Sequence, residues 1–340
     1  MNGAIIGFGQ AARHGHWPAY AESRELSIVA VVDRTEERRL LAASLDPALR
    51  TYASLEDLAA AETIDFLDIC TPPALHHDPM RAALARGWHV VCEKPFVLDP
   101  AQLAAVRVTA EARQLAVVPV HNWKFAPIVR DATERLRQGA IGRLERVEVE
   151  TERLRDFQGA DPARPNWRRD PAIAGGGILM DHGWHAVYLV LQWFEALPRE
   201  IDARFHRPAP DAVEDEADVR LAFACGEATI RLTWNGTIRR NAIRLVGDGG
   251  SITIADDRLI VERADNREVV TYPAALSSSS HHADWFAAFV PSIAGYFNHP
   301  ALSRAVLEEA AACLDIIQRA YLVGRSRCPG PPVPGRRSDV

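Results

Sequence analysis

A glycine-rich turn directly after the first apolar segment constrains the fold of this chain more than any other feature. Residues 4–6 are apolar, as in a buried strand, and the segment after the glycines has a helical pattern. Gly7 permits the tight turn, Gly9 leaves room for a ligand to approach the backbone, and Ala12 lets helix and strand pack closely. Because free N–H groups at a helix start attract phosphates, this pattern predicts a dinucleotide-binding unit.

Short apolar segments alternate with helical patterns throughout the N-terminal third of the chain. Thr35 and Ser54 stand at expected helix N-caps, and two acidic residues follow each of them in the first helical turn. This alternation is typical of an α/β fold with a doubly wound parallel sheet, here a Rossmann domain. The expected strands are residues 4–6, 26–32, 64–69, 89–92 and 116–120, and the expected helices are residues 35–43, 55–61, 79–86 and 100–113.

The pattern changes after residue 122. A helix at 127–138 and a half-buried strand at 144–152 precede a polar loop at 155–171, and glycines at 175–177 open a helix at 179–193. Consecutive alternating segments with a hairpin turn at 247–250 then indicate a largely antiparallel sheet, hence an α+β domain. Its strands are expected at residues 219–224, 228–234, 242–246, 251–255, 259–262 and 268–272, and final helices at 282–296 and 301–322.

These patterns predict two domains and a tail. We expect an NAD(P)-binding domain over residues 1–122 and a domain for substrate binding and oligomerisation over residues 123–328. Residues 329–340 begin with a cluster of prolines that cannot pack, so we expect a disordered tail there.

Composition excludes several classes of function. Of the 340 residues 48% are hydrophobic and 25% charged, as in an average globular protein, and the net charge of −6 leaves no basic stripe for nucleic acid. No apolar segment is long enough to cross a membrane. The five cysteines are scattered, which suggests reduced thiols in a cytoplasmic protein. They have no metal-site spacing, and although the segment 281–284 looks like a metal pattern, no third ligand is spaced to join it, so no metal is expected.

The nucleotide preference depends on the residues that close the second expected strand. The carboxylate of Asp33 can accept hydrogen bonds from both adenosine ribose hydroxyls and would repel a 2′-phosphate, which favours NAD. Asp33 could also simply cap the next helix. Arg34 keeps NADP open, because its guanidinium could meet a 2′-phosphate or cover the adenine. The cofactor residues expected from this half of the site are Gly7, Phe8, Gly9, Gln10, Ala11, Ala12, Asp33 and Arg34.

Two further strand ends fall at the same edge of the predicted sheet, where open parallel sheets bind ligands. One carries Cys70, Thr71, Pro72 and Pro73, and its prolines also fit a simple end to the strand. The other carries Glu93 and Lys94. Because a lysine at a buried strand end is costly unless it is used, Lys94 is predicted to be functional.

Asp181 and His185 follow the glycine run at 175–177 and are four residues apart. On a helix this spacing puts both side chains on one face, within reach of a common ligand. A pair of this kind usually lies on a solvated surface, but the apolar residues around it indicate a buried face. An imidazole is the natural proton acceptor at neutral pH, and the carboxylate can orient it or bind substrate.

The order of these motifs resembles that of the Gfo/Idh/MocA oxidoreductases, which include glucose–fructose oxidoreductase and inositol dehydrogenase. The resemblance extends over about residues 3–325 and includes the segment 121–127. It implies a C-terminal domain with an open sheet that mediates homodimers or homotetramers, and it implies that Lys94 and His185 are catalytic and Asp181 supports them. Asn122 is expected at the cofactor. The sequence departs from the family's usual pattern in two places. The segment 13–18 has an extra residue, and Lys124 stands where the family usually has arginine.

The expected reaction is hydride transfer between a nicotinamide and a secondary alcohol or ketone of a sugar, inositol or related polyol. His185 would exchange the hydroxyl proton and Lys94 would stabilise the charge on the oxygen. Alternatives are an NAD-dependent elimination or glycoside cleavage through a transient ketone, and a non-enzymatic NAD sensor. Further pocket candidates, each equally explained as loop anchors or solvated charges, are Lys124, Arg155, Trp167, Arg168 and His282.

Overall fold

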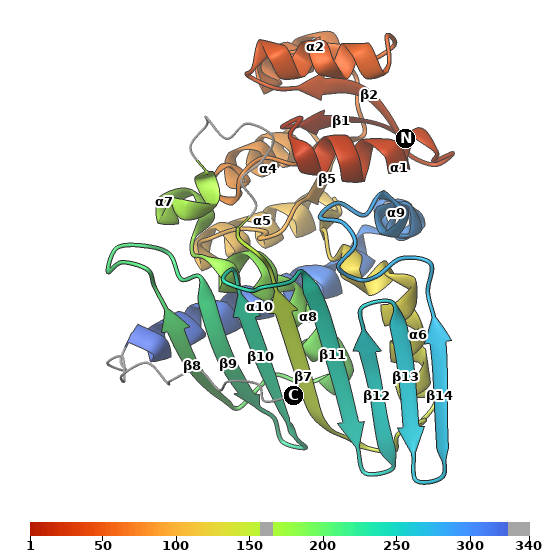
Figure 1. The fold of residues 1–340 in the computed structure, drawn as a ribbon. Helices are drawn as coiled ribbons and strands as arrows, with labels where there is room; N and C mark the ends of the chain where they lie inside the picture. The colour runs from red at the N-terminus through yellow and green to blue at the C-terminus, as the bar shows by residue number, and fades with distance from the viewer. Residues whose placement is uncertain (157–165, 326–340) are drawn as a thin grey trace.

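The computed structural model describes residues 1–156 and 166–325, in which two sheets are joined by layers of helices (Figure 1). The expected tail at 329–340 and much of the expected loop at 155–171 lie outside the described residues. No helix in the described ranges is both long and apolar enough to cross a membrane.

The N-terminal sheet consists of β1 (Asn2–Ile6), β2 (Ser27–Val32), β3 (Arg50–Tyr52), β4 (Phe66–Ile69), β5 (His89–Cys92) and β6 (Val117–Pro119). Its order is β3-β2-β1-β4-β5-β6, and all neighbouring strands are parallel. The order reverses between β1 and β4, and open α/β sheets bind ligands at such a reversal. The predicted Rossmann sheet is confirmed.

Helices and short turns link these strands: η1 (Ala12–His16), α1 (Trp17–Ala21), α2 (Glu36–Leu45), α3 (Leu55–Ala61), η2 (Pro73–Leu75), α4 (His77–Ala85), α5 (Pro100–Arg113) and η3 (Asn122–Phe125). Leu58 and Met80 belong to one hydrophobic core, whereas Ala19 and Ala42 belong to another. The predicted cap at Ser54 is confirmed, since its Oγ accepts the backbone N–H of Asp57 at 3.1 Å. Thr35 precedes α2 but makes no capping bond with its side chain.

The C-terminal sheet consists of β7 (Leu144–Glu152), β8 (Glu200–His206), β9 (Glu216–Ala222), β10 (Glu227–Thr233), β11 (Arg240–Gly247), β12 (Gly250–Ala255), β13 (Arg258–Arg263) and β14 (Asn266–Thr271). The order is β14-β13-β12-β11-β7-β10-β9-β8. Neighbours are antiparallel except β7 and β10, which are parallel. The predicted antiparallel sheet and its hairpin turn at 247–250 are confirmed.

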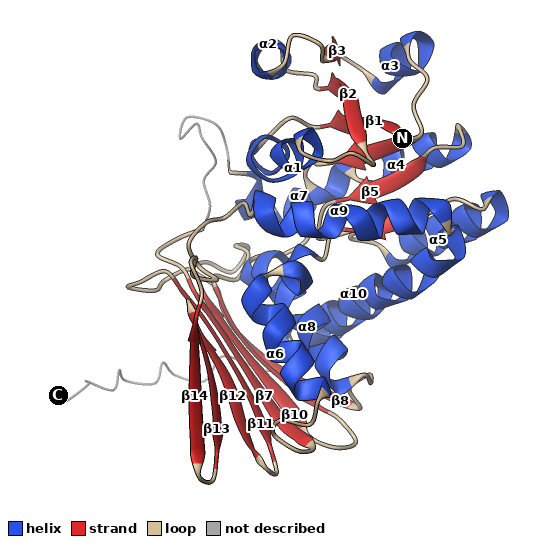
Figure 2. Ribbon diagram, turned by 90° about the vertical axis from the view of Figure 1, so that its right-hand side faces the viewer, coloured by secondary structure: helices blue, strands red, loops and turns tan. Residues whose placement is uncertain are grey.

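The remaining helical elements are α6 (Pro127–Arg137), η4 (Trp167–Arg169), α7 (Pro171–Ala174), η5 (Leu179–Gly183), α8 (Trp184–Phe194), α9 (Ala283–Asn298), η6 (Pro300–Leu302) and α10 (Ser303–Arg325). Figure 2 shows α6, α8 and α10 on one face of the C-terminal sheet, whose other face is open in the described part of the chain. Helix α8 is buried along nearly its whole length, so it forms the centre of this layer.

Helix α9 returns from the C-terminal half of the chain to the Rossmann sheet. Phe286 and Ile293 of this helix belong to the same buried cluster as Ile5 of β1, Val31 of β2 and Val118 of β6. Figure 2 shows α9 beside α1 along that sheet. One face of the N-terminal sheet is therefore completed by a segment far away in the sequence.

Three features differ from the expectations. Strand β3 has only three residues, and β8 is an edge strand in which Ala203 alone is buried, so neither has a clear hydrophobic period. The helices at 12–21 and 179–194 both begin as π-turns rather than as regular α-helix. A π-turn holds one residue more than an α-turn, and the first of them lies where the segment 13–18 has its extra residue.

Candidate active site

The glycine turn after β1 has the geometry that a dinucleotide requires. Gly7 has φ +88°, and a Cβ there would lie 2.9 Å from the Thr71 side chain and 3.0 Å from the backbone of Cys70. A Cβ at Gly9 would meet no atom within 4 Å, so the space above this turn is open. The residues of the turn thus fit a bound pyrophosphate. The strand end at Cys70 lies directly against the turn.

Asp33 connects this turn to the end of β2. Its Oδ2 accepts the backbone N–H of Phe8 at 2.8 Å and its Oδ1 accepts that of Thr35 at 2.8 Å. The buried carboxylate of Asp33 therefore does two things: it lies beside the cofactor turn, and it bonds the backbone at the start of the next helix. Oδ1 keeps a second lone pair for a ribose hydroxyl. Arg34 is exposed, and the half-buried Arg38 lies with NH1 3.4 Å from Asp33 Oδ2.

His16, which the sequence pattern did not indicate, links the two central strand ends. Its Nδ1 lies 2.7 Å from Asp68 Oδ2 in β4, and its Nε2 lies 2.9 Å from Glu93 Oε1 after β5. Burial alone would lower the pKa of His16, but Asp68 and the Cys70 thiol raise it well above its ordinary value. The ring is therefore an imidazolium between two carboxylates, and it stacks on Phe286 of α9 at 3.9 Å between ring centroids.

Lys94 and Asp181 form the centre of the site. The Lys94 ammonium lies 2.9 Å from Asp181 Oδ1 and 3.0 Å from the Asp181 backbone oxygen, although 87 residues separate them in the chain. Arg168 Nε lies 3.3 Å from the other carboxylate oxygen. Burial alone would raise the pKa of Asp181, but Lys94 and Arg168 hold it well below its ordinary value. Asp181 is therefore ionised and fixes the lysine at the ligand edge of the Rossmann sheet.

His185 lies beside this pair but is held by a different residue. Its Nδ1 is 2.8 Å from the hydroxyl of Tyr188, which also accepts the backbone N–H of Trp123 at 3.1 Å. Its ring stacks on the Trp123 indole at 4.5 Å between centroids. Of the two expected roles of Asp181, orienting the imidazole or binding substrate, the first is not seen among the described contacts, because Lys94 and Arg168 engage that carboxylate. Burial, and next the Lys94 ammonium, lower the pKa of His185 well below its ordinary value, so the ring is neutral.

The glycine run before η5 makes room for a second residue that the sequence pattern did not indicate. The buried carboxylate of Glu214 accepts the backbone N–H groups of Gly177 and Leu179 at 3.0 Å, and the Tyr321 hydroxyl at 2.6 Å. A Cβ at Gly177 would lie 1.9 Å from the Glu214 backbone oxygen, and one at Gly176 would lie 2.1 Å from the Tyr321 hydroxyl. Glycine is thus required where the helical segment that carries Asp181 and His185 starts.

The candidate pocket residues divide into two groups. Trp167, Arg168 and Asp181 line a common cavity with Pro73 of the cofactor edge; its other residues are Pro95, Ala174, Gly176 and Gly177. The remaining candidates do not line this cavity. The Lys124 ammonium pairs with Glu309, Arg155 is exposed, His282 stacks on Trp285 at the start of α9, and Asn122 begins η3.

One set of potential metal ligands exists among the described residues. The ligand atoms of His16, Asp68 and Cys70 lie within 4.8 Å of one another. Hydrogen bonds inside the set already engage these groups, and burial raises the pKa of the Cys70 thiol to about 12, which disfavours the thiolate that a metal needs. The absence of a metal stays a prediction.

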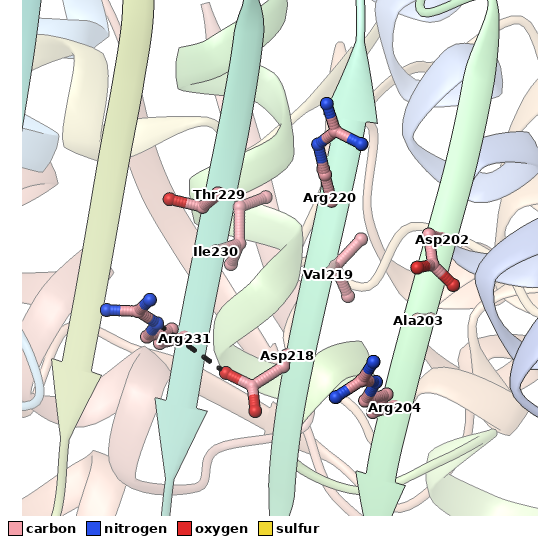
Figure 3. A pocket seen from close by; sticks show the side chains of 9 residues that line it. All are labelled: Asp202, Ala203, Arg204, Asp218, Val219, Arg220, Thr229, Ile230 and Arg231. Carbon is pink, nitrogen blue, oxygen red and sulfur yellow. Dashed lines mark ion pairs between the residues drawn. The ribbon is translucent and has the colours of Figure 1, made fainter.

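A larger hollow lies on the open face of the C-terminal sheet, not at Lys94 or His185. Figure 3 shows its charged side chains on β8, β9 and β10, with Arg231 and Asp218 paired at 3.8 Å. Its lining is Asp202, Ala203, Arg204, Asp218, Val219, Arg220, Thr229, Ile230 and Arg231. Its charged residues are aspartates and arginines, with no lysine or histidine, so the smaller cavity at Asp181 is the catalytic candidate.

A Rossmann sheet whose ligand edge presents a fixed ammonium and a neutral histidine is the arrangement of a nicotinamide-dependent oxidoreductase. Comparison with known proteins narrows this class. A family profile described as oxidoreductase family, NAD-binding Rossmann fold matches residues 1–121, and the GFO/IDH/MocA C-terminal domain matches residues 129–253. The chain therefore belongs to the Gfo/Idh/MocA family and is an NAD(P)-dependent oxidoreductase, which confirms the resemblance.

Curated relatives and solved structures are consistent with this membership. The chain is 34% identical over 167 residues to D-xylose 1-dehydrogenase (NADP(+)) 2 of Haloferax volcanii, which is 49% of each chain. It is 30% identical over 187 residues to D-glucoside 3-dehydrogenase of Escherichia coli, 54% of this chain and 50% of the relative. The matches thus span about half the length of these relatives. An oxidoreductase from Agrobacterium radiobacter, solved with NAD+, L-tartaric acid and magnesium, has the same fold, with TM-score 0.81 and 20% identity over 96% of both chains.

Proposed function

We propose that this protein transfers a hydride between a nicotinamide cofactor and a secondary alcohol or ketone of a sugar, inositol or related polyol. The observation that carries the proposal is the pairing of Lys94 with Asp181 beside the neutral, buried His185. An ammonium can stabilise charge on a reacting oxygen, and a neutral imidazole can exchange its proton. The names of the curated relatives, two of which are sugar dehydrogenases, support this substrate class.

The roles of the three central residues follow from their surroundings. Lys94 donates a hydrogen bond to the substrate oxygen and favours its alkoxide-like form. Asp181 fixes Lys94 by two contacts. His185 takes the hydroxyl proton in oxidation and returns it in reduction at Nε2, which is free to accept it when Nδ1–H donates to the Tyr188 oxygen. The bound nicotinamide supplies the hydride acceptor or donor.

The cofactor residues are proposed from the same geometry. Gly7, Gly9 and Ala12 with the neighbouring turn hold the pyrophosphate, and Asp33 binds the adenosine ribose. The buried carboxylate of Asp33 favours NAD over NADP, because a 2′-phosphate would face a second negative charge. The strand ends at 70–73 and 93–94 complete the nicotinamide side, with Asn122 next to them.

We also propose that residues 1–122 and 123–328 are the two functional domains and that the cytoplasmic protein is a homodimer or homotetramer. The open face of the C-terminal sheet is the surface proposed for this assembly. Oppositely charged side chains alternate there across β7 and β11, with Arg240 3.2 Å from Glu150. Such a face can pair with a copy of itself across a two-fold axis.

The first experiment is a fluorescence titration with NADH and NADPH, followed by a screen of polyols, sugars and their keto forms at the nicotinamide absorbance band. Turnover of one such class supports the proposal. In His185→Ala, turnover should fall by roughly 10²–10⁴-fold while NADH affinity is kept. Equal turnover by this variant would remove His185 from the reaction. Cofactor that returns to its starting redox state each cycle would instead favour elimination, and binding without any turnover would favour a sensor.

A further inference from the structure

The end of β7 carries a buried cation that has no ion-pair partner among the described residues. Arg153 follows β7 directly and is 4% exposed. Its guanidinium donates to the backbone oxygens of Glu152 and Arg240 at 2.8 and 3.0 Å, and to Asn241 Oδ1 at 3.0 Å. These acceptors are all neutral, and the buried Nε has no partner among the described residues.

Arg153 is adjacent to the catalytic π-turn. Its backbone N–H bonds to the Thr233 oxygen at 2.9 Å, at the end of β10. The preceding residue of that strand, Leu232, lies 3.2 Å from the position of a Cβ on Gly183, the last residue of η5. Arg153 and Asp181 also influence each other electrostatically, since Asp181 raises the pKa of Arg153 against the effect of burial. Even so, burial lowers the pKa of Arg153 to about 10, so it is charged at pH 7.

A second arginine reinforces the positive charge near Arg153. Arg239 stands on the exposed rim and donates only to neutral acceptors, the backbone oxygens of Ser277 and Ser279 at 2.6 and 2.8 Å and the Ser280 hydroxyl. Arg239 and Arg153 are close enough to repel each other. Asp256 is the one carboxylate that acts on both of them, and no ion pair joins it to either within the described ranges.

His182, His281 and His282 add no charge at neutral pH. Burial is the main cause that lowers the pKa of His182 to about 3 and those of His281 and His282 to about 4. The charged His16 is paired with Asp68 and Glu93. The carboxylate of Asp181 engages Lys94 and Arg168, whereas Arg153 and Arg239 have no ion-pair partner among the described residues. A buried cation such as Arg153 is costly unless a ligand of opposite charge completes it.

We propose that the substrate is acidic and that Arg153 and Arg239 bind its oxyanion, a carboxylate or a phosphate, while its alcohol lies at Lys94 and His185. This inference rests on the proposed function, because it names the substrate class of the same site. A guanidinium suits this task, since its planar donors match the oxygens of a carboxylate or phosphate. The substrate class is then sugar acids or sugar phosphates rather than neutral sugars.

The test compares matched neutral and acidic substrates on the protein saturated with NAD+: D-glucose, D-gluconate, D-glucuronate and D-glucose 6-phosphate. We expect kcat/KM to be roughly 100-fold higher for one acidic member than for D-glucose, and to fall as salt is added. A preference for D-gluconate or D-glucuronate would identify a carboxylate as the oxyanion, and a preference for D-glucose 6-phosphate would identify a phosphate. Equal rates for neutral and acidic sugars would overturn the inference and leave the proposed function intact.

Variants locate the oxyanion. Arg239→Gln should raise KM for the acidic substrate roughly tenfold with kcat nearly unchanged, and Arg258→Gln, an exposed charge on β13, is the matched control. Arg239 is used because it is exposed, whereas replacing Arg153 removes three hydrogen bonds that join β7 and β11. Equal effects of the two variants would overturn the assignment to Arg153 and Arg239.

A binding measurement separates this inference from the proposed function. Malonate and inorganic phosphate are titrated calorimetrically into the NADH complex of wild type and Arg239→Gln. Binding of one of them that Arg239→Gln weakens supports an oxyanion site even if no sugar is turned over, in which case only the hydride-transfer proposal fails. Binding of neither anion, with neutral sugars turned over, would overturn the oxyanion site alone.

Discussion

Replacing Tyr188 by phenylalanine tests how His185 is held. The hydroxyl of Tyr188 contacts His185 Nδ1 at 2.8 Å and accepts the Trp123 N–H at 3.1 Å, and both Tyr188 and His185 are buried. The phenylalanine ring fills the same space, so the change removes two hydrogen bonds and little packing. Each buried group left unsatisfied costs about 1–3 kcal/mol. The free energy of unfolding should therefore fall by about 2–6 kcal/mol.

The rate should fall because His185 loses the group that orients its ring. One oriented hydrogen bond worth about 1.4–2.8 kcal/mol in the transition state corresponds to a loss of about 10–100-fold in kcat. The stacking of the ring on Trp123 is unchanged, so we expect the loss to be smaller than that of His185→Ala. The affinity for NADH should stay the same, since Tyr188 lies in α8 and not at the glycine turn.

The assay measures kcat and KM with the substrate found in the screen, together with urea unfolding. Tyr272→Phe is the control, because it also loses a hydroxyl bond, to Asp131 of α6 at 2.6 Å, and neither residue lines the cavity at Asp181. It should lose stability without losing kcat. In the double variant Tyr188→Phe, His185→Ala the tyrosine change should have no further effect on rate. Unchanged kcat in Tyr188→Phe, or an additive loss in the double variant, would refute this account of the site.

Three further predictions concern the cofactor, pH and metal content. Asp33→Ala should weaken NADH roughly tenfold and NADPH less, by fluorescence titration; an equal loss for both nucleotides contradicts the ribose role. The raised pKa of His16 means that its charge stabilises the fold fully below about pH 6.5 and that this contribution is lost as pH rises through the folded pKa. Melting curves of wild type and His16→Asn should therefore converge at alkaline pH, and a constant difference from pH 6 upward would rule this out. Elemental analysis should find no stoichiometric zinc; one zinc per chain would assign a metal to His16, Asp68 and Cys70.

Elements with a strong local signal could be predicted from the sequence almost to the residue. The bounds of β5, α5 and β7 agree with the expected ranges, because each combines a clear apolar period with a cap, a proline or a polar boundary. Strand β8 has one buried residue and only β9 beside it, so its strand state depends on tertiary pairing. Local sequence patterns do not predict the secondary structure of residues that depends on pairing with distant segments.

The same distinction holds within the site. Lys94, Asp181 and His185 could be predicted because their residue types stand at strand ends and at a helix start where ligands bind. The partners that set their properties could not. His16 meets Asp68 and Glu93 at sequence separations of 52 and 77, and Glu214 reaches Gly177 across 37 residues. The π-turns that carry these side chains also depend on packing, and Lys94 and Arg168 rather than His185 engage the Asp181 carboxylate.

The position of helix α9 in the chain affects how the protein folds during its synthesis on the ribosome. The Rossmann strands emerge first, but Phe286, Phe289 and Ile293, which cover one face of that sheet, are made more than a hundred and fifty residues later. Until then an apolar layer around Ile5 and Val118 faces water. The nascent N-terminal half is thus a natural client for chaperones, and a fragment ending near residue 122 would aggregate rather than fold.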